Sequence, residues 1–301
     1  MILCFSVVFA VFPLLSLGDY LLRAVTLFLL YLIIAQSWNI LGGYGGQISL
    51  GNSSFFGIGG YAAALLIVSR VSIWASILIG GLIAAALTFF MIPAFRLRAS
   101  YFAILTLFLG AAMQALVTQL AVTTNTPVTV YLPMGMMSSI SLYYWILAVT
   151  VLILVLVMIL ERSKIISALR AIKADEDSAE SLGINAALYK TIGLFLMSLT
   201  TGIAGALYVV FIGFAEPSDI FAVEWGVYPL FMGIVGGIGT YVGPIIGAAI
   251  FAIALQWLVA FVGTFSLLSL AVLLVVIVLT MPNGIINIFA MFKAARDKSK
   301  R

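Results

Sequence analysis

Long apolar runs follow one another along almost the whole chain and constrain its fold more than any other feature. Hydrophobic residues make up 64% of the 301 residues and charged residues 8%, a balance outside the range of soluble domains. About twenty apolar residues in a helix cross the hydrocarbon core of a bilayer, whereas the alternation typical of a transmembrane barrel, over about ten residues, does not recur here. The sequence therefore predicts an all-α, polytopic bundle of transmembrane helices.

Polar and glycine-rich breaks divide the apolar runs into about ten candidate spans, with eight to ten as the plausible range. These spans cover residues 2–17, 20–41, 53–69, 73–95, 100–122, 140–160, 190–213, 225–240, 244–262 and 266–286. The runs 2–17, 53–69 and 225–240 are short for a full crossing and are also compatible with half-helices or re-entrant segments. The first run lacks a basic leader and a small-residue cleavage site, so we expect a retained helix rather than a signal peptide.

One stretch, residues 161–190, carries ten of the charged side chains and is called here the charged segment. Its central part has a short amphipathic helical pattern that ends at Gly183, a residue suited to stopping a helix. Lys and Arg also occur in the turn 96–98 and in the tail 293–301, and such residues concentrate in cytoplasmic loops. We therefore expect these three regions in the cytoplasm and the acidic loop 214–224 outside.

Several absences limit the chemistry that this chain can perform. No acidic residue falls inside a predicted span, which disfavours proton coupling, although backbone carbonyls could still bind sodium. The chain has no phosphate-binding loop of the G-x-x-x-x-G-K-[ST] type, no histidine and a single cysteine, Cys4. We expect no catalytic residues, no metal site and no cofactor. If transport is active, its energy comes from a partner, and the charged segment is the only sizeable cytoplasmic structure that could receive it.

Residues 41–61 contain eight glycines, and an uninterrupted helix is not expected through 42–46. Irregular backbone at membrane depth is tolerated where it is buried in protein or lines a watery cavity. The break is therefore predicted to line a translocation path through Gly45, Gly46, Gln47, Ser49, Asn52 and Ser53. The alternative is close helix packing, which is favoured for Gly57, Gly59 and Gly60.

A second glycine-rich break covers residues 233–247. Pro244 suits the first turn of a new helix, with Gly243 before it. The pattern G-G-x-G occurs at 42–45 and again at 236–239, which hints at an internal duplication, although chance in a glycine-rich chain explains four matched positions better.

Four blocks of sequence together resemble the permease subunits of ABC importers for branched-chain amino acids, on the LivM branch of the LivH/LivM family. The order and spacing of these blocks carry the resemblance: they cover residues 37–51 with 55–61, 96–104, 170–190, and 236–244. The resemblance implies one transmembrane permease domain over 1–301, with 161–190 as a cytoplasmic coupling loop and 293–301 as a basic cytoplasmic tail.

Permeases of this kind carry an E-A-A-x-x-x-G pattern in the loop that docks on the ATPase, and residues 177–183 resemble a degenerate copy of it. A solvated loop helix is the alternative. The resemblance implies that this helix fits a groove on an ATP-binding subunit, with apolar anchors at Leu169, Ile172, Ala179 and Leu182 and with flanking charges that set register. The implied coupling residues are Leu169, Ile172, Asp177, Ala179, Glu180, Leu182 and Gly183.

The implied partners are a second, LivH-like permease, two ATP-binding cassette subunits, an extracytoplasmic solute-binding protein and membrane lipid, with no nucleic acid. The implied location is the inner membrane of a bacterium or archaeon. An ATP-independent channel or an ion-coupled carrier for a small solute is the alternative function. The basic tail could bind anionic lipid, but anchoring on the cytoplasmic side explains it more simply.

The substrate does not follow from the resemblance, because the chain departs from the family pattern at several positions. Asn52 stands where family members commonly have histidine, and Ala111 lies at or near the place of a frequent glutamate. A zwitterionic amino acid needs both donors and acceptors, which the break can offer, but urea or a short amide would be served equally well.

Overall fold

The computed structural model of the chain is a bundle of helices, and it describes residues 2–15, 18–97, 99–133, 135–262 and the single positions 265, 269 and 272. The predicted span 266–286 and the tail 293–301 lie essentially outside the described residues. The first half contains α1 (Ile2–Val11), η1 (Phe12–Leu15), α2 (Asp19–Trp38), η2 (Asn39–Tyr44), α3 (Asn52–Val68), α4 (Ile73–Ala86), α5 (Thr88–Met91), η3 (Ile92–Arg96) and α6 (Ala99–Thr123).

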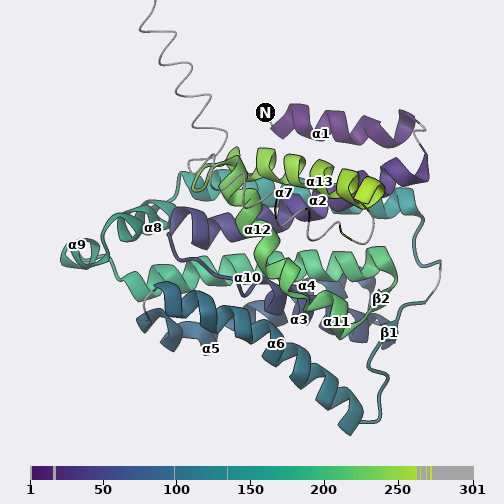
Figure 1. The fold of residues 1–301 in the computed structure, drawn as a ribbon, viewed down its shortest axis with the longest axis horizontal. Helices are drawn as coiled ribbons and strands as arrows, with labels where there is room; N and C mark the ends of the chain where they lie inside the picture. The colour runs from purple at the N-terminus through teal and green to yellow at the C-terminus, as the bar shows by residue number, and fades with distance from the viewer. Residues whose placement is uncertain are drawn as a thin grey trace, which may run out of the picture.

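The second half alternates long helices with short connecting elements. It contains β1 (Val130–Tyr131), α7 (Ser139–Glu161), α8 (Lys164–Ala174), α9 (Glu176–Ser181), α10 (Ala186–Ile212), β2 (Phe214–Ala215), α11 (Pro217–Ile220), α12 (Val223–Gly236) and α13 (Gly243–Val262). The two short strands pair antiparallel, with Val130 opposite Ala215. This pairing lies at one end of the bundle, whereas α8 and α9 lie at the other, at the left of Figure 1.

Six helical stretches in the described part of the chain are long and apolar enough to cross a membrane. They are Asp19–Tyr44, Ile73–Phe95, Ser100–Thr123, Ser139–Glu161, Ala186–Ile212 and Pro217–Gly236, and two shorter apolar helices cover Asn52–Val68 and Gly243–Leu258. The all-α, multi-pass class predicted from the apolar runs is therefore confirmed. The predicted count of eight to ten spans is not reached by these six.

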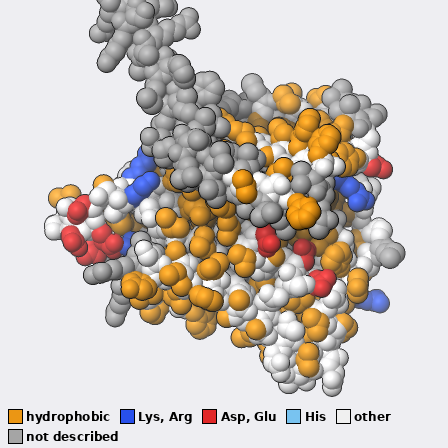
Figure 2. Space-filling view, viewed as in Figure 1, with side chains coloured by type: hydrophobic (Ala, Val, Ile, Leu, Met, Phe, Trp, Pro, Cys, Tyr) orange, Lys and Arg blue, Asp and Glu red, His pale blue; other side chains and the backbone are white. Residues whose placement is uncertain are grey.

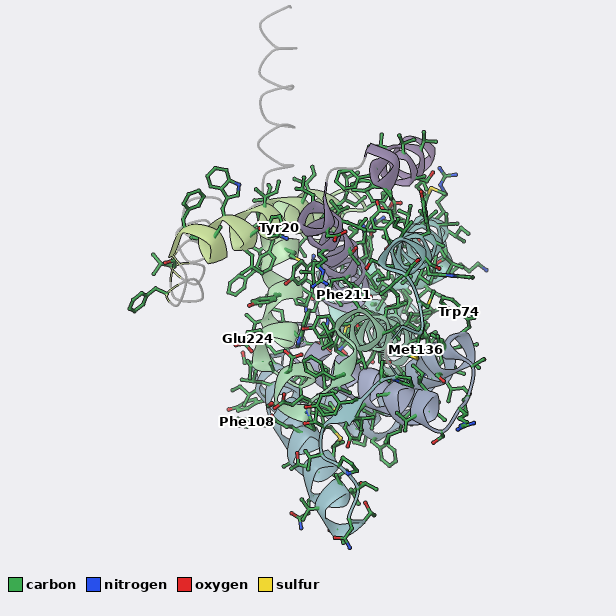
Figure 3. All side chains as sticks on the ribbon, turned by 90° about the vertical axis from the view of Figure 1, so that its right-hand side faces the viewer. Tyr20, Trp74, Phe108, Met136, Phe211 and Glu224 are labelled. Atoms are coloured by element: carbon green, nitrogen blue, oxygen red, sulfur yellow. The ribbon has the colours of Figure 1, made fainter. Side chains whose placement is uncertain are left out.

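Helix α2 forms the centre of the bundle, with 78% of its most apolar window buried. It packs against α7, α10, α12 and α13, and the largest hydrophobic cluster is built on its second half, from Leu29 to Ala35. By contrast, the far end of α6 extends away from the other helices at the bottom of Figure 1, and 17% of the most apolar window of α6 is buried. Figure 3 looks onto the opposite end from α8 and α9 and shows the same separation, with Phe108 of α6 labelled. In a membrane, the exposed apolar side chains of α6 would contact lipid or a partner subunit.

Helices α3, α4 and α10 cross at very close range because glycines meet at the crossing. A Cβ atom on Gly59 would collide with the backbone of Gly202, and one on Gly205 would collide with the carbonyl oxygen of Phe56. Gly57 lies against the ring of Phe221, and Gly60 lies against Val209 and Gly205. The prediction that Gly57, Gly59 and Gly60 serve close packing is confirmed.

Candidate functional site

The first glycine-rich break begins where the helix of α2 and η2 ends. The helix that starts as α2 continues through Gly42 and Gly43 in the wider π form of η2, and it ends at Tyr44. The indole ring of Trp38 lies over Gly42, where a Cβ atom would be 2.5 Å from the ring, so the helix can continue there only because Gly42 has no side chain. The expectation that no uninterrupted helix runs through 42–46 is therefore confirmed: the helix ends at Tyr44, and the irregular backbone covers 45–51.

The irregular backbone of residues 45–51 is held by hydrogen bonds to its own surroundings. The amides of Gly45 and Gln47 both donate to the carbonyl oxygen of Leu41, at 3.1 and 3.3 Å. Trp38 Nε1 donates to Ser49 O at 2.8 Å, and Leu50 N donates to Thr106 Oγ1 of α6 at 3.0 Å. Hydrogen bonds thus connect this irregular backbone to α2 and to α6.

The second break lies directly beside the first, although the two are far apart in sequence. Helix α12 ends at Gly236 and α13 begins at Gly243, as the Gly243-Pro244 pair predicted. The side-chain amide of Asn39 bonds this break twice: Nδ2 donates to Thr240 O at 3.0 Å, and Oδ1 accepts from Gly239 N at 3.0 Å. One turn earlier, Gln36 Nε2 donates to Tyr241 O at 2.9 Å.

The predicted pathway residues lie within the irregular backbone of 45–51 or directly after it, and nearly all of them are buried. Gly46 is half-buried, and Gly45, Gln47, Ser49, Asn52 and Ser53 are buried. Their lining of a path stays a prediction, because the two cavities described below do not include them.

Several polar atoms at this place have no hydrogen-bond partner. Both amide atoms of Asn52 are unpaired, as are Gln47 Nε2 and Ser54 Oγ, and all three side chains are buried. Burying an unpaired polar atom is costly, so these atoms are candidates for contact with water or with a polar solute. Ser54 was not among the predicted residues; its place next to Ser53 in a polar run was the available signal.

The charged segment folds as two helices rather than one. Asp175 has an extended backbone between α8 and α9, and its carboxylate accepts a hydrogen bond from Ser178 N at 2.7 Å. This bond from the backbone amide of Ser178 lowers the pKa of the Asp175 carboxyl group. Asp175 followed by two acidic residues is a helix-start signal that the sequence analysis missed.

The predicted helix stop at Gly183 is confirmed. Gly183 has a φ of +85°, its amide donates to Glu180 O, and the amide of Ile184 donates to Ala179 O. This pair of bonds closes the end of α9 in the manner of a Schellman motif, which favours glycine at the left-handed position. The chain then restarts at once, since Asn185 Oδ1 caps α10 by accepting from Leu188 N at 2.9 Å.

Three of the apolar anchors that the resemblance implied are turned inward in this chain. Leu169, Ile172 and Ala179 are buried against this chain itself, with exposed fractions of 0%, 4% and 3%. Leu169 packs on Gly45 and Gly193, while Ile172 and Ala179 form a small cluster with Ala186. Their side chains are therefore not free to enter a groove on another subunit.

The remaining predicted coupling residues form the exposed tip of the bundle. Asp177, Glu180, Leu182 and Gly183 are exposed, and Leu182 is 82% exposed. Figure 2 shows acidic and basic side chains gathered at this tip, on the left, and many hydrophobic side chains across the middle of the face. An exposed leucine among carboxylates is a surface that a complementary subunit could cover.

An ion pair fastens α9 to α10. Lys190 is 4% exposed, and its Nζ lies 2.6 and 2.7 Å from the two carboxylate oxygens of Glu176. The pair borders a cleft of about 420 Å³ that is lined by Ile92, Pro93, Phe95, Glu176, Glu180, Ala187 and Lys190. A second cavity, of about 460 Å³, is almost wholly apolar and lies between α2 and α13.

Helix α8 also contacts η2, directly before the irregular backbone, through two basic residues. Lys173 Nζ donates to Gly43 O at 2.9 Å, and the guanidinium of Arg170 lies 5.1 Å from the centre of the Tyr44 ring. Arg170 also pairs with Glu161 at 3.0 Å. The charged segment and the glycine break are thus parts of one contact region.

The family described as "Branched-chain amino acid transport system / permease component" matches residues 20–281. The high-affinity branched-chain amino acid transport system permease protein LivM of Escherichia coli K12 is 27% identical over 293 residues, covering 87% of this chain and 68% of that protein. LivM of Salmonella typhimurium LT2 is 26% identical with the same coverage.

No solved structure matches the chain. The family match runs through both glycine breaks, the charged segment and every element from α2 to α13. The chain therefore belongs to the family of permease components of branched-chain amino acid transport systems.

Proposed function

We propose that this chain is the membrane permease subunit of an ABC importer that moves a branched-chain amino acid, or a similar small polar solute, across the inner membrane. Separate subunits hydrolyse ATP, a second permease similar to LivH completes the pore, and an extracytoplasmic protein delivers the solute. The observation that carries this proposal is the exposed tip of α8 and α9, which rests on the two glycine breaks at the end of the bundle. The family relationship supports it.

The proposed ATPase contact uses the exposed residues of the tip rather than the buried anchors. Leu182 supplies the apolar contact, and Asp177 and Glu180 supply charges that fix the register of the partner. Gly183 ends the helix there and keeps the tip short. The buried side chains hold α8 and α9 against the rest of the bundle; they are Leu169, Ile172 and Ala179.

The proposed solute path passes the end of the first break, where Gln47, Asn52 and Ser54 carry unpaired polar atoms. Amide groups offer both donors and acceptors, as a zwitterion requires. We further propose that the short helices α3 and α13 also cross the membrane, and that α1 and the run 266–286 complete a count of ten.

The test is uptake of radiolabelled leucine into vesicles that contain this chain with its partner subunits. Uptake is expected only with ATP and a hydrolysis-competent ATPase. Leu182→Glu is expected to reduce co-purification of the ATPase by about tenfold, because the change removes an apolar contact and adds a like charge beside Glu180. The control is Val223→Glu, which changes an apolar, 51% exposed residue toward the opposite end of the bundle and should leave co-purification unchanged.

Uptake that persists without any ATPase, or that follows an imposed ion gradient, would contradict the proposal and favour a channel or a carrier. ATP-dependent uptake of another solute in place of leucine would support the proposed permease function and contradict only the proposed substrate.

A further inference from the structure

The contact between α8 and the first glycine break depends on one lysine that the sequence patterns do not single out. The methylene groups of Lys173 lie against Gly46, where a Cβ atom would come within 2.7 Å of Lys173 Cγ. Gly46 has a φ of +68°, so this position favours glycine for its backbone as well as for its space. The lysine stem therefore occupies the space that a side chain at position 46 would need.

The ammonium group of Lys173 lies at the end of the helix formed by α2 and η2. Its acceptor, Gly43 O, belongs to the last turn, where carbonyl groups lack partners within the helix and carry partial negative charge. Lys173 as a residue is exposed, but partial desolvation of its ammonium group and the nearby charge of Arg170 lower the pKa of Lys173. A charged donor on such a carbonyl makes a stronger hydrogen bond than a neutral one.

Gly239 of the second break lies close to the same carbonyl group, Gly43 O. A Cβ atom on Gly239 would lie 2.9 Å from Gly43 O and 3.5 Å from Lys173 Nζ, so the two breaks and the lysine converge within one contact distance. Asn39 joins the breaks to each other through its two amide bonds to Gly239 and Thr240. Movement of Lys173 therefore acts on both breaks together.

We infer that Lys173 is the positioning residue that transmits movement of the ATPase-docked α8 and α9 to both glycine breaks, and hence to the solute path. The inference rests on the proposed function. Leu169 adds an apolar contact between α8 and Gly45, but an apolar contact can slide. The hydrogen bond of Lys173 fixes α8 to one carbonyl group of η2, so pulling α8 away displaces that carbonyl.

The decisive experiment compares Lys173→Met with Lys173→Arg in the complete complex. Methionine keeps an unbranched stem on Gly46 and removes the ammonium group, whereas arginine keeps a charged donor. The measured quantity is the number of solute molecules taken up per ATP hydrolysed, per assembled complex. In Lys173→Met we expect this ratio to fall about tenfold while assembly and basal ATP hydrolysis remain, since a charge-assisted hydrogen bond is worth roughly a factor of ten or more. Lys173→Arg should restore most of the ratio.

Lys164→Met is the matched control, because Lys164 is an exposed lysine at the start of the same helix and should not change the ratio. An unchanged ratio in Lys173→Met would overturn the inference and leave the proposed function intact. Loss of assembly with an unchanged ratio in the remaining complexes would assign Lys173 a structural role and also overturn it. Absence of ATP-dependent uptake in the wild type would remove the proposed function itself.

Discussion

At the scale of single residues, Asn52 and Gln36 form an informative pair. Both side chains are fully buried amides, but Gln36 donates to Tyr241 O whereas neither amide atom of Asn52 has a partner. Elsewhere in the described bundle, Thr88 and Ser198 are hydrogen-bonded to each other at 2.9 Å. Gln36 lacks a partner at Oε1 alone, whereas Asn52 lacks one at both of its amide atoms. We therefore propose that Asn52 contacts the transported solute.

Asn52→Leu is expected to leave the unfolding temperature unchanged or higher and to reduce uptake by about tenfold. An unpaired buried amide costs about 1–3 kcal/mol, which an apolar side chain of similar size recovers, while its hydrogen bonds to solute are lost. The control is Gln36→Leu, which leaves Tyr241 O without its donor and should lower stability. Thermal unfolding in detergent and vesicle uptake measure the two effects. Wild-type uptake by Asn52→Leu would exclude this residue from the path.

At the scale of elements, the crossing of α3 and α10 depends on the absence of side chains. Gly205 sits against the carbonyl oxygen of Phe56, and the backbones of the two helices touch there. Gly193, on the same helix, faces only the ends of the Leu41 and Leu169 side chains, at 3.3 and 3.4 Å from the position of a Cβ atom. Replacing each of these two glycines with alanine therefore separates the effect of close packing on stability from the effect of helix propensity.

Gly205→Ala is expected to destabilise the chain, because forcing a methyl group into a packed crossing costs about 1–3 kcal/mol and outweighs the gain in helix propensity. Gly193→Ala is expected to be neutral or stabilising, because flexible leucine side chains can move aside. The midpoint temperature of unfolding in detergent should be lower than that of the wild type for Gly205→Ala, and equal to it or higher for Gly193→Ala. Equal midpoints for the two variants would show that the crossing tolerates a side chain.

At the scale of the whole molecule, the two ends of the bundle differ in charge. The tip of α8 and α9 lies at one end with basic residues beside it, and the loop from Glu216 to Glu224, which holds no Lys or Arg, lies toward the other end. Because Lys and Arg concentrate in cytoplasmic loops, we propose that the tip is cytoplasmic. The single native cysteine, Cys4, makes this easy to test.

In a Cys4→Ala background, Ser181→Cys and Ser218→Cys place one thiol at each end, at exposed positions. A membrane-impermeant maleimide should label Ser218→Cys in whole cells and Ser181→Cys only in inside-out vesicles. The reverse pattern would invert the proposed orientation and, with it, the ATPase contact at the tip.

Much of the local structure could be predicted from short stretches of sequence. The stop at Gly183 and the start at Gly243-Pro244 follow from backbone preferences of glycine and proline, which act over a few residues. Asp175 could also have been recognised as a helix start. The π form of η2 could not, because it depends on Trp38 folding over Gly42 and on contacts from α8 and the second break.

The sequence by itself determined that this chain is a helical, multi-pass membrane protein, because apolar runs of sufficient length must satisfy their backbone hydrogen bonds internally. It also located the charged segment and both glycine breaks. Only the tertiary structure decided that the breaks lie side by side, joined by Asn39 and Gly239 across 200 residues, and that Lys173 bonds one of them. The same packing turned Leu169, Ile172 and Ala179 inward, since a helical pattern identifies an apolar face but not the neighbour that buries it.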